Sequence, residues 1–554
     1  MWDSEMNADY SAAPRADVAC GLSSRHPCGT VPIRESIAYP FLEQATTQPH
    51  REAVRHSSGV YTYGQLAERA ISVAGGLQDF GVTPGSRISL IANRDPQLIV
   101  SVIACLMAGA IISVVDASYP VRRIHGMVTA ARPACVLVAG TRYRPDSGIP
   151  VLSTDEIAFR SGTVAENTSA HAYLGHTSGT TGHPKLVNGT HSAVRHFIQW
   201  YTQNFKLDAR TRFAMISGLS HDPLWRDIFL PLSIGGQVHI PDVRTWAHGE
   251  KLAAWLQENA ITDLNTTPTM ARRFLTGQGG PLAALRRVVL GGEPTYWDDL
   301  RSFTRSAPAA TFVPSYGATE TPQIAALGVL DPGDIGDQSG MVPLGAAAPG
   351  FELMLVDEAG VRLSGEGFGE IVVRSPHIAH GYFDTENSTV FRVSGGVRTY
   401  ATGDMAYRTA QGSVVFRGRD DRRIKVRGVR IESTEIESAI RELPEVVDSV
   451  VVMAPPQLPG KGLPASEKLL AFVATRESGS LSERQVKSHL AKALPAPAVP
   501  EYVSVTREFP IGTNGKVDLP VMLDEWRKEV HTRAVPQTIG AARPDPRFRT
   551  PADE

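Results

Sequence analysis

The sequence predicts an α/β protein with a large N-terminal domain and a smaller α+β domain, and three observations lead to that prediction. The chain has 554 residues, enough for two or more domains, and is 42% hydrophobic and 20% charged, which is ordinary for a globular protein. Buried-strand patterns alternate with helical patterns over most of its length, which favours parallel-rich sheets covered by helices. Beyond Gly418, short strands surround two helices, which favours a small α+β domain.

The first strong helical pattern lies in the stretch TYGQLAERAISVAGGLQDFG. Its apolar residues recur at spacings of 4, 3, 4 and 3, so they form one face of a helix that Gly81 can end. Such a face must pack on a sheet. The residues of this face are Leu66, Ala70, Val73, Leu77 and Phe80.

The segments that follow alternate between strand and helix patterns. Because such alternation builds parallel sheets, we expect ligands to bind at the carboxyl ends of the strands. Strands are predicted at 87–92, 111–115, 135–139, 213–216, 237–240 and 287–290, and helices at 96–108, 224–232 and 296–305.

The C-terminal part has strands predicted at 423–426, 446–453 and 469–474. One of its helices is expected to begin at Thr434, because Glu437 three residues on would complete a capping box. The resulting domain boundaries are an N-terminal extension at 1–35, a large domain at 36–417, a hinge and small domain at 418–530, and a disordered Pro- and Arg-rich tail at 531–554.

Composition and charge exclude several classes of partner. Lys and Arg number 55 against 57 Asp and Glu, for a net charge of −2, and no basic run stands out, so neither nucleic acid nor a membrane is expected. No signal peptide or membrane span is recognisable, which favours a cytoplasmic enzyme. The cysteines show no zinc-ligand spacing and are expected to be free thiols; they are Cys20, Cys28, Cys105 and Cys135.

The run HTSGTTGHPKLV at 176–187 is the strongest functional signal. Its hydroxyls and unshielded backbone N–H groups can wrap a triphosphate, and Lys185 adds a cation. It is not a Walker motif, because Pro184 precedes the lysine and no Ser or Thr follows it. A flexible linker is the alternative interpretation. The phosphate-binding residues are predicted to be Thr177, Ser178, Gly179, Thr180, Thr181, Gly182 and Lys185.

This run resembles the signature loop of the adenylate-forming superfamily, which comprises acyl-CoA synthetases, luciferases and the adenylation domains of nonribosomal peptide synthetases. Other motifs follow in the family's order over roughly residues 40 to 520, although each is weak alone. They are TYGQL, LMAGAIISVVDASYP, SYGATE, YATGDM, GRDDRRIKVRGVRIESTEIE and NGKVD. The resemblance implies that a carboxylate reacts with ATP to give an acyl adenylate and pyrophosphate, and that the small domain is mobile and swings before the acyl group passes to a thiol.

The resemblance also implies a nucleotide site. Tyr316 would stack on adenine, Thr319 would bond the α-phosphate, and Glu320 would hold Mg²⁺. Asp404 would accept bonds from the ribose hydroxyls. Pro314 departs from the usual synthetase form, which has Asn there, and offers only a carbonyl. The full set beyond the phosphate loop is Gly291, Gly292, Glu293, Tyr316, Gly317, Thr319, Asp404, Arg419 and Lys516.

Two further roles follow from the same resemblance. NGKVD at 514–518 resembles the loop that delivers the catalytic lysine, so Lys516 is assigned to catalysis with Glu320 and Lys185. Asp421 is assigned as the hinge pivot. A solvated lysine and a charged edge strand are the alternative interpretations. Pro497 stands where the family commonly has Tyr, at a place that bears on closure of the small domain.

The segment SHDPLWRDIFLPL at 220–232 points to the substrate. In peptide-synthetase relatives an Asp here binds the α-ammonium group, and Asp222 falls on that position. Arg226 would share its helical face, so a carboxylate and a guanidinium together would suit a zwitterion. The HDPxxRD spelling also resembles α-aminoadipate-activating domains. An exposed Asp222–Arg226 pair is the alternative interpretation. The substrate pocket that this resemblance implies includes Asp222, Pro223, Arg226, Asn265, Val289, Gly291, Ser315, Gln323 and Ile324.

The leading hypothesis is a stand-alone amino-acid adenylation enzyme of secondary metabolism that uses ATP and Mg²⁺. An amino dicarboxylic acid is the candidate substrate, with activation of its distal carboxyl left open. Residues 519–554 hold no phosphopantetheine attachment site, so the acceptor is expected to be the 4'-phosphopantetheine arm of a carrier protein in trans. The need for a small activator protein stays open. An acyl-CoA synthetase and a nucleotide-binding regulator that has lost turnover are the alternatives.

Overall fold

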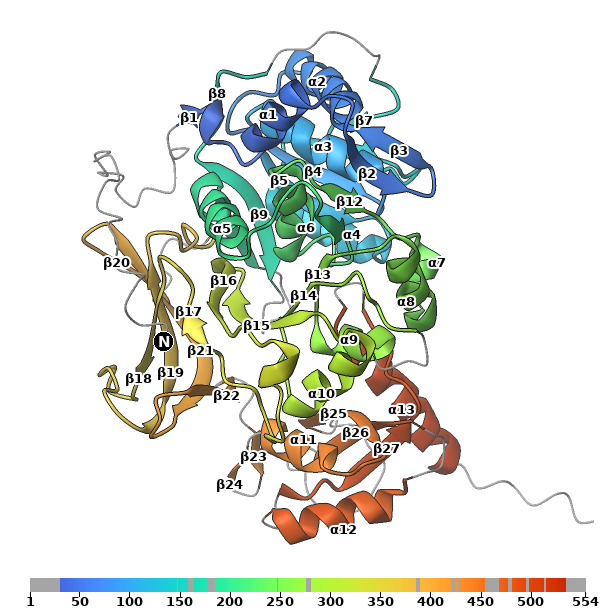
Figure 1. The fold of residues 1–554 in the computed structure, drawn as a ribbon, viewed down its shortest axis with the longest axis vertical. Helices are drawn as coiled ribbons and strands as arrows, with labels where there is room; N and C mark the ends of the chain where they lie inside the picture. Colours follow the sequence, from blue (N-terminus) through green and yellow to red (C-terminus); the bar gives the residue numbers. More distant parts are fainter. Residues whose placement is uncertain are drawn as a thin grey trace, which may run out of the picture. The chain divides into compact units, whose positions relative to one another are not determined.

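The chain divides into two compact units in a computed structural model. The large unit comprises Met1–Arg423 together with Thr513–Lys516, and the small unit comprises Ile424–Gly512 and Val517–Glu554. The structure describes residues 30–146, 148–157, 164–177, 185–246, 248–275, 280–384, 389–419, 424–426, 429–431, 433–453, 468–476, 481–494, 498–512 and 515–534 (Figure 1).

The first sheet of the large unit has six strands in the order β10-β9-β5-β4-β6-β7. All neighbours are parallel except β9 and β10, which pair antiparallel. The strands predicted at 87–92 and 135–139 are confirmed to the residue. The bounds are β4 Arg87–Ala92, β5 Ile111–Asp116, β6 Cys135–Ala139, β7 Val151–Ser153, β9 His171–Thr177 and β10 Lys185–Thr190.

The second sheet has nine strands in the order β17-β16-β15-β14-β13-β11-β12-β2-β3. The run from β15 to β2 is parallel, and β3, β16 and β17 add antiparallel edges. The bounds are β2 Glu52–His56, β3 Gly59–Thr62, β11 Arg212–Ala214, β12 Gln237–His239, β13 Asp263–Thr266, β14 Arg287–Gly291, β15 Thr311–Ala318, β16 Thr321–Leu327 and β17 Ala346–Ala347.

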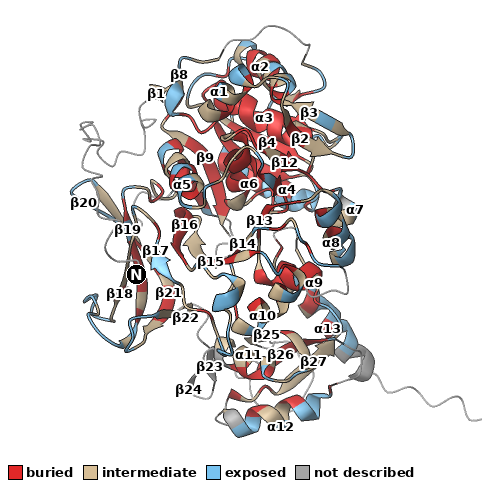
Figure 2. Cartoon of the chain, in the orientation of Figure 1, coloured by how far each residue is buried: buried red, intermediate tan, exposed pale blue. Residues whose placement is uncertain are grey.

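Helices pack against these two sheets, and buried residues concentrate on the strands and on α3 (Figure 2). Because parallel strands need crossover connections, most helices lie between consecutive strands of the sheets. Their bounds are α1 Tyr39–Thr47, α2 Tyr63–Asp79, α3 Pro96–Met107, α4 Val121–Ala131, α5 His191–Asn204, α6 Pro223–Leu232, α7 Val243–Trp246, α8 Gly249–Glu258, α9 Pro268–Leu275 and α10 Trp297–Ser306.

The helix predicted from the TYGQL stretch is α2, and one residue of its predicted face is wrong. Thr62 and Gln65 close its N-terminus as a capping box, and Leu66, Ala70, Val73 and Leu77 are fully buried. Phe80 is 44% exposed instead, because the helix ends at Asp79 and the chain has already left the helical path. Gly81 follows in a left-handed conformation, with φ of +99°.

The predicted N-terminal extension is partly ordered. β1 (Thr30–Pro32) pairs antiparallel with β8 (Asn167–Ser169), and a short 3₁₀ helix, η1, covers Ile33–Glu35. A strand of three residues is too short to show periodicity, so the pairing depends on a distant segment that local sequence cannot reveal. Residues 1–29 of the predicted extension lie outside the described residues.

A third sheet in the large unit was not predicted. Its strands run in the order β18-β19-β21-β20, with β22 paired to β21, and all pairs are antiparallel. No helical pattern separates these strands, so the alternation that revealed the other sheets is absent here. The bounds are β18 Glu352–Val356, β19 Gly367–Ser375, β20 Phe391–Ser394, β21 Val397–Arg408 and β22 Val414–Arg419, preceded by the 3₁₀ helix η2 Pro332–Asp334.

The small unit is α+β, as predicted. β26 lies between β25, which is antiparallel to it, and β27, which is parallel, while β23 and β24 form a separate pair. The bounds are β23 Ile424–Val426, β24 Val429–Ile431, α11 Ser433–Arg441, β25 Val446–Met453, β26 Leu469–Thr475, α12 Glu483–Ala493, β27 Tyr502–Thr506 and α13 Leu519–Ala534.

Two details of the small unit differ from the prediction. α11 already includes Ser433, so Thr434 lies inside the first turn, and the Glu437 carboxylate accepts the N–H of Val451 at 2.8 Å. α13 continues to Ala534, so residues 531–534 are helical although they were assigned to a disordered tail. The residues of that tail beyond 534 lie outside the described residues.

Candidate active site

The predicted ammonium-binding carboxylate, Asp222, lies at the start of α6 and is 8% exposed. It has helical backbone angles and makes no capping bond to its own helix. Instead, Oδ1 accepts the hydroxyl of Tyr173 at 2.5 Å and Oδ2 accepts the backbone N–H of Gln323 at 2.8 Å. Burial raises the pKa of Asp222, and these two donors oppose that rise. The carboxylate is therefore fixed in place and partly satisfied.

Tyr173 is a site residue that the sequence did not reveal. Its side chain is 1% exposed and packs on the Trp225 ring, with 4.7 Å between ring centroids. On β10 the opposing residue is Gly189, where an added Cβ would lie 2.2 Å from the Tyr173 ring. Only glycine therefore leaves room for the tyrosine that holds Asp222. The stretch HAYLGHT shows only a strand pattern, so no local signal marks this role.

Arg226 is buried beside Asp222, and the exposed-pair interpretation is wrong. The side chain is 6% exposed, with its guanidinium 5.9 Å from the Phe197 ring centroid. Its Nε and Nη1 atoms are buried and have no hydrogen-bond partner, and no ion pair joins it to Asp222 where the chain is described. Burial lowers the pKa of Arg226, while Asp222 and Asp227 raise it.

A second buried carboxylate, Asp227, was also missed. It accepts Asn265 Nδ2 at 2.8 Å and the N–H of Ser217 at 2.9 Å, and burial raises its pKa to about 6. Arg94 donates to the carbonyls of Met215 and Ser217 at 2.8 and 2.7 Å. These bonds fix the connection between β11 and α6, while Oδ1 of Asn265 is buried without a partner.

The remaining predicted substrate residues lie on adjacent elements. Asn265 on β13 is opposite Val289 on β14, and Gly291 is opposite Ser315 on β15. A Cβ at Gly291 would lie 2.7 Å from Ser315 Oγ, so the glycine allows this close approach. Three residues complete the set, namely Pro223 at the first position of α6 and Gln323 and buried Ile324 on β16.

The predicted nucleotide residues Tyr316, Asp404 and Arg419 lie together. The Tyr316 hydroxyl donates to Asp404 Oδ2 at 2.6 Å, and Arg419 Nη1 donates to Oδ1 at 3.1 Å. The SYGATE motif forms the end of β15 and the turn into β16. Gly317 is needed there, because an added Cβ would lie 2.9 Å from the Gln323 carbonyl oxygen.

Glu320 and Lys185 are both in contact with Tyr382, a residue that the sequence did not single out. The Tyr382 hydroxyl donates to Glu320 Oε1 at 2.8 Å, and Lys185 Nζ lies 5.0 Å from the centroid of its ring. Glu320 is 7% exposed. Because Mg²⁺ is usually held by one or two carboxylates plus substrate phosphates, a single carboxylate here fits the predicted ion. No group of three or more potential metal ligands occurs among the described residues.

The phosphate loop is described only at its ends. Thr177 is opposite Lys185 in the β9–β10 pair and its hydroxyl donates to the Lys185 carbonyl at 3.3 Å. Thr319 approaches β9 closely, since a Cβ at Gly175 would lie 2.6 Å from its Cγ2. The predicted loop residues Ser178, Gly179, Thr180, Thr181 and Gly182, and the predicted hinge Asp421, lie outside the described residues.

Lys516 lies next to Gly292 within the large unit. A Cβ at Gly292 would be 3.3 Å from Lys516 Cε and 3.4 Å from Nζ. The neighbouring Gly515 carbonyl accepts the hydroxyl of Thr267 at 2.6 Å. Burial, with a smaller contribution from the Lys516 charge, lowers the pKa of His221 to about 4. Glu293 accepts the N–H of Thr269 at 3.1 Å, so its carboxylate has a structural partner.

Replacing Tyr382 with phenylalanine tests its contact with Glu320. The variant keeps the ring beside Lys185 but loses the hydroxyl donor, so we expect a roughly tenfold lower kcat and a weaker Mg²⁺-dependent gain in ATP affinity. Steady-state adenylation at varied Mg²⁺ and calorimetric ATP binding with and without Mg²⁺ measure both effects. Tyr407→Phe is the matched control, because that exposed hydroxyl bonds Glu366. Equal behaviour of the two variants would contradict the prediction.

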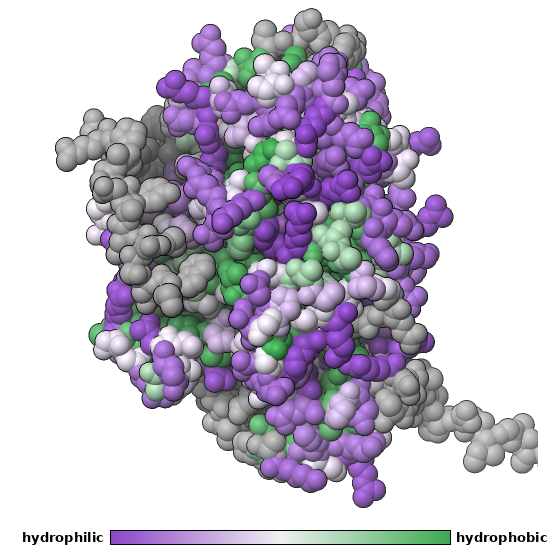
Figure 3. Space-filling model, in the orientation of Figure 1, coloured by the Kyte–Doolittle hydropathy of each residue, from purple (hydrophilic) through white to green (hydrophobic). Residues whose placement is uncertain are grey.

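The predicted substrate residues around Asp222 and the predicted nucleotide residues around Asp404 each lie together, and comparison with known proteins decides the family. The family model for the AMP-binding enzyme matches residues 41–383, and that for the AMP-binding enzyme C-terminal domain matches residues 435–516. The chain belongs to the AMP-binding enzyme family. This AMP-binding enzyme thus falls among the AMP-forming ligases of the adenylate-forming superfamily, whose members use ATP. No described helix combines the length and apolar character needed to cross a bilayer, and hydrophilic residues dominate the face shown in Figure 3.

Similar proteins include enzymes much longer than this AMP-binding enzyme. Phenyloxazoline synthase MbtB of Mycobacterium tuberculosis is 30% identical over 524 residues, 93% of this chain and 36% of its own length. The L-2-aminoadipate reductase large subunit of Penicillium chrysogenum is 27% identical over 576 residues, 86% and 40% of the two chains. The chain therefore spans about a third to two fifths of these relatives.

Solved structures share the fold of this AMP-binding enzyme. A holo four-domain nonribosomal peptide synthetase bound to AMP and glycine aligns with a TM-score of 0.75 at 23% identity, covering 93% of this chain and 37% of that one. A benzoate CoA ligase from Burkholderia xenovorans aligns with a TM-score of 0.74 at 21% identity, covering 88% and 99%. The predicted fold class is confirmed.

Proposed function

We propose that this enzyme activates an amino acid with a second acidic group as its aminoacyl adenylate and passes the acyl group to the phosphopantetheine thiol of a carrier protein. The observation that carries the proposal is the pair of buried, unpartnered N–H groups on Arg226, beside the buried carboxylate of Asp222. The two side chains would recognise opposite charges on one small molecule. The likeness to a holo nonribosomal peptide synthetase supports the carrier as acceptor.

The cost of burial supports a charged ligand at Arg226. Guanidinium N–H groups without hydrogen-bond partners are expensive to bury, because they lose their bonds to water, and the charges of Asp222 and Asp227 offset only part of that cost. A carboxylate would accept the Nε and Nη1 donors and compensate the charge. Asn265 Oδ1 and Gln323 Oε1, which are also buried without partners, are acceptors and would suit the N–H groups of an amino acid.

At the other side of this pocket, Asp222 is suited to an ammonium group. Tyr173 and Gln323 each donate one hydrogen bond to it, and a carboxylate has capacity for more. An ammonium that bonds this carboxylate would offset the burial that raises its pKa. Neutral aliphatic amino acids would satisfy Asp222 but leave Nε and Nη1 of Arg226 without acceptors.

Charge neutralisation would account for most of the adenylation chemistry assigned to this chain. Lys185 and Lys516 would offset negative charge that develops on the phosphates as the carboxylate attacks. Mg²⁺, held by Glu320, would supply further positive charge there. The Tyr382 hydroxyl would keep the Glu320 carboxylate oriented. Asp404 would accept hydrogen bonds from the ribose hydroxyls in addition to those from Tyr316 and Arg419.

A pyrophosphate-exchange screen tests the substrate. Aminoadipate, glutamate and aspartate are compared with neutral amino acids and with dicarboxylic acids that lack the amino group. We expect exchange to be strongest with an amino dicarboxylic acid. Product analysis with a phosphopantetheinylated carrier protein and with free CoA then identifies the acceptor. Preference for neutral amino acids would refute the second acidic group, and thioester formation on CoA alone would refute the carrier.

Arg226→Met is expected to separate activity from stability. The methionine fills similar space without a charge, so exchange with the dicarboxylic substrate should fall at least about a hundredfold while ATP binding persists. The free energy of unfolding should rise by about 1–3 kcal/mol, because an unpartnered buried charge is removed. Urea unfolding and the exchange assay measure these changes.

Arg272→Met is the matched control for stability. Arg272 is equally buried, but it makes two hydrogen bonds of 2.7 Å to Asp299, so its replacement removes both bonds from a partly buried carboxylate. This control should unfold more easily than the wild type. If Arg226→Met also destabilised the protein and left dicarboxylate exchange unchanged, Arg226 would be a structural residue and the proposed substrate class would be wrong.

A further inference from the structure

A hollow of about 460 Å³ lies in the large unit, lined by four arginines and by no acidic side chain. Arg212 is the first residue of β11, and Arg286 immediately precedes β14. Both therefore lie at the amino ends of parallel strands. Gly291, at the carboxyl end of β14, is separated from Arg287 by roughly 13 Å of extended chain. The hollow is thus at the opposite edge of the sheet from the candidate active site.

The charges around this hollow are unevenly compensated. Arg210 is paired with Asp208 through Nε at 3.0 Å and Nη2 at 2.6 Å. Arg51 donates only to the backbone carbonyls of Ala209 and Gly235. In the described part of the chain, the side chains of Arg212 and Arg286 make no hydrogen bond or ion pair and are exposed. Arg51, Arg212 and Arg286 thus form no ion pair in the described part of the chain, although Arg286 lies near enough to Asp208 and Asp263 to interact with their charges through space.

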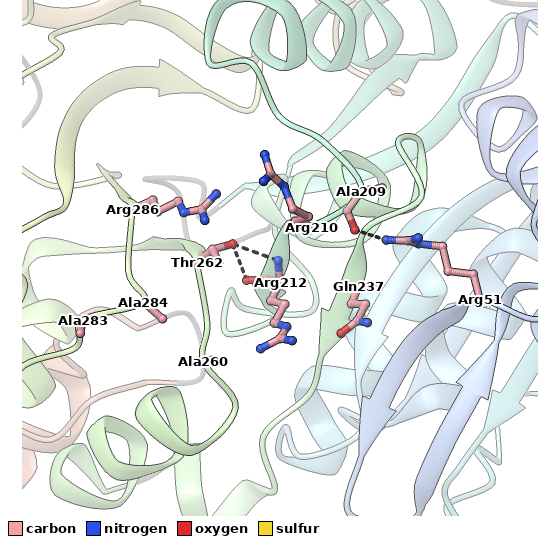
Figure 4. Close-up of a pocket in the computed structure, with 10 residues that line it drawn as sticks. All are labelled: Arg51, Ala209, Arg210, Arg212, Gln237, Ala260, Thr262, Ala283, Ala284 and Arg286. Atoms are coloured by element: carbon pink, nitrogen blue, oxygen red, sulfur yellow. Dashed lines mark hydrogen bonds between the residues drawn. The ribbon is translucent and has the colours of Figure 1, made fainter.

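The two nearby carboxylates, Asp208 and Asp263, pair directly with other arginines. Asp263 is buried and pairs with Arg287, and the Thr262 hydroxyl donates to Asp263 and accepts the backbone N–H of Arg212. Figure 4 shows the side chains of Arg51 and Arg286 reaching toward the hollow from opposite sides, with Arg212 between them. The arrangement therefore places several positively charged guanidinium groups around one hollow.

We propose that this hollow binds a small molecule that carries two or more linked phosphate groups, at a site separate from the reaction's ATP. Guanidinium forks match phosphate oxygens bidentately, and two phosphate groups carry roughly three to four negative charges, which suits three arginines that form no ion pair. The volume lies within the range of small-ligand pockets. Bound phosphate would also remove the mutual repulsion of the arginines at this sheet edge.

Calorimetric titration with inorganic tripolyphosphate tests this site. Tripolyphosphate can also bind at the reaction site, but it does so equally in the wild type and in every variant. The difference in binding between them therefore reports on the hollow. The double variant Arg212→Gln/Arg286→Gln is expected to bind one ion fewer per chain than the wild type, or to bind it at least about tenfold more weakly. Its AMP affinity should remain that of the wild type, its melting temperature without ligand should be equal or higher because two like charges are removed, and tripolyphosphate should raise that temperature less than in the wild type.

The control removes the same charge elsewhere. Arg305→Gln/Arg484→Gln alters two exposed arginines that do not line the hollow and should bind as the wild type does. Equal loss in both double variants would show non-specific charge attraction and overturn the proposal, as would unchanged binding in the first. A parallel loss of AMP binding would place the effect at the reaction site and overturn it too. Citrate binding as tightly as tripolyphosphate would overturn the phosphate class.

Discussion

Replacement of Lys516 with alanine is expected to lower the kcat of adenylation by a factor on the order of 10² to 10³, comparable to the loss of an oxyanion-hole donor. The side chain lies beside Gly292 and close enough to His221 to lower its pKa. A positive charge at that place would stabilise the negative charge that develops on the phosphates during the reaction. The fold should persist, because the side chain is only partly buried.

Pyrophosphate exchange at saturating ATP and substrate measures this effect, and thermal melting verifies the fold. Lys528→Ala is the control, since that lysine is exposed on α13 and pairs with Asp524 one helical turn away. Lys516→Arg should recover part of the rate if charge at this place is what matters. Exchange at the wild-type rate in Lys516→Ala would remove Lys516 from catalysis.

Replacement of Asp222 with asparagine is expected to lower kcat/KM for the amino acid on the order of 10² to 10³, because a buried ammonium would lose its counter-charge. The amide also cannot accept both the Tyr173 hydroxyl and the Gln323 N–H without presenting an NH₂ group to one of them. The measurement is pyrophosphate exchange with the amino acid and with the same acid lacking its amino group.

The wild type should prefer the amino acid strongly. Asp222→Asn should lose that preference and should use the acid without the amino group about as well as the wild type does. Tyr173→Phe is an intermediate control, because it removes one donor and leaves the charge. An equal fall for both acids would mean that Asp222 supports the fold of α6 and does not recognise an ammonium group.

Local sequence patterns were sufficient to predict those helices and strands whose structure is decided by their own residues. The strands at Arg87–Ala92 and Cys135–Ala139 are continuous apolar runs, and both coincide with β4 and β6. The antiparallel sheet β18–β22 was missed, because its pairing joins segments that no helical pattern separates. Phe80 fits the helical period of α2 but follows its last residue.

The site was predictable only where a motif names its residues. Asp222, Glu320 and Asp404 belong to recognisable sequence motifs. Tyr173 and Tyr382 donate hydrogen bonds to Asp222 and Glu320 from a strand and a loop whose sequences carry no such motif. Tyr173 depends on Gly189, which lies across a strand pair, and Tyr382 reaches Glu320 from 62 residues away. Such partners are set by tertiary pairing, so a single sequence cannot reveal them.

The backbone at Gln323 restricts how this pocket can change its substrate. Gln323 has a φ of +74°, in the left-handed region where side chains with branched Cβ atoms are strained. Its N–H must keep that orientation to reach Asp222. Variant libraries that place valine or isoleucine at this position would therefore lose the ammonium contact together with the old specificity. Glycine and asparagine are the replacements that the backbone accepts, so new specificities will be found more readily by varying Arg226 or Asn265.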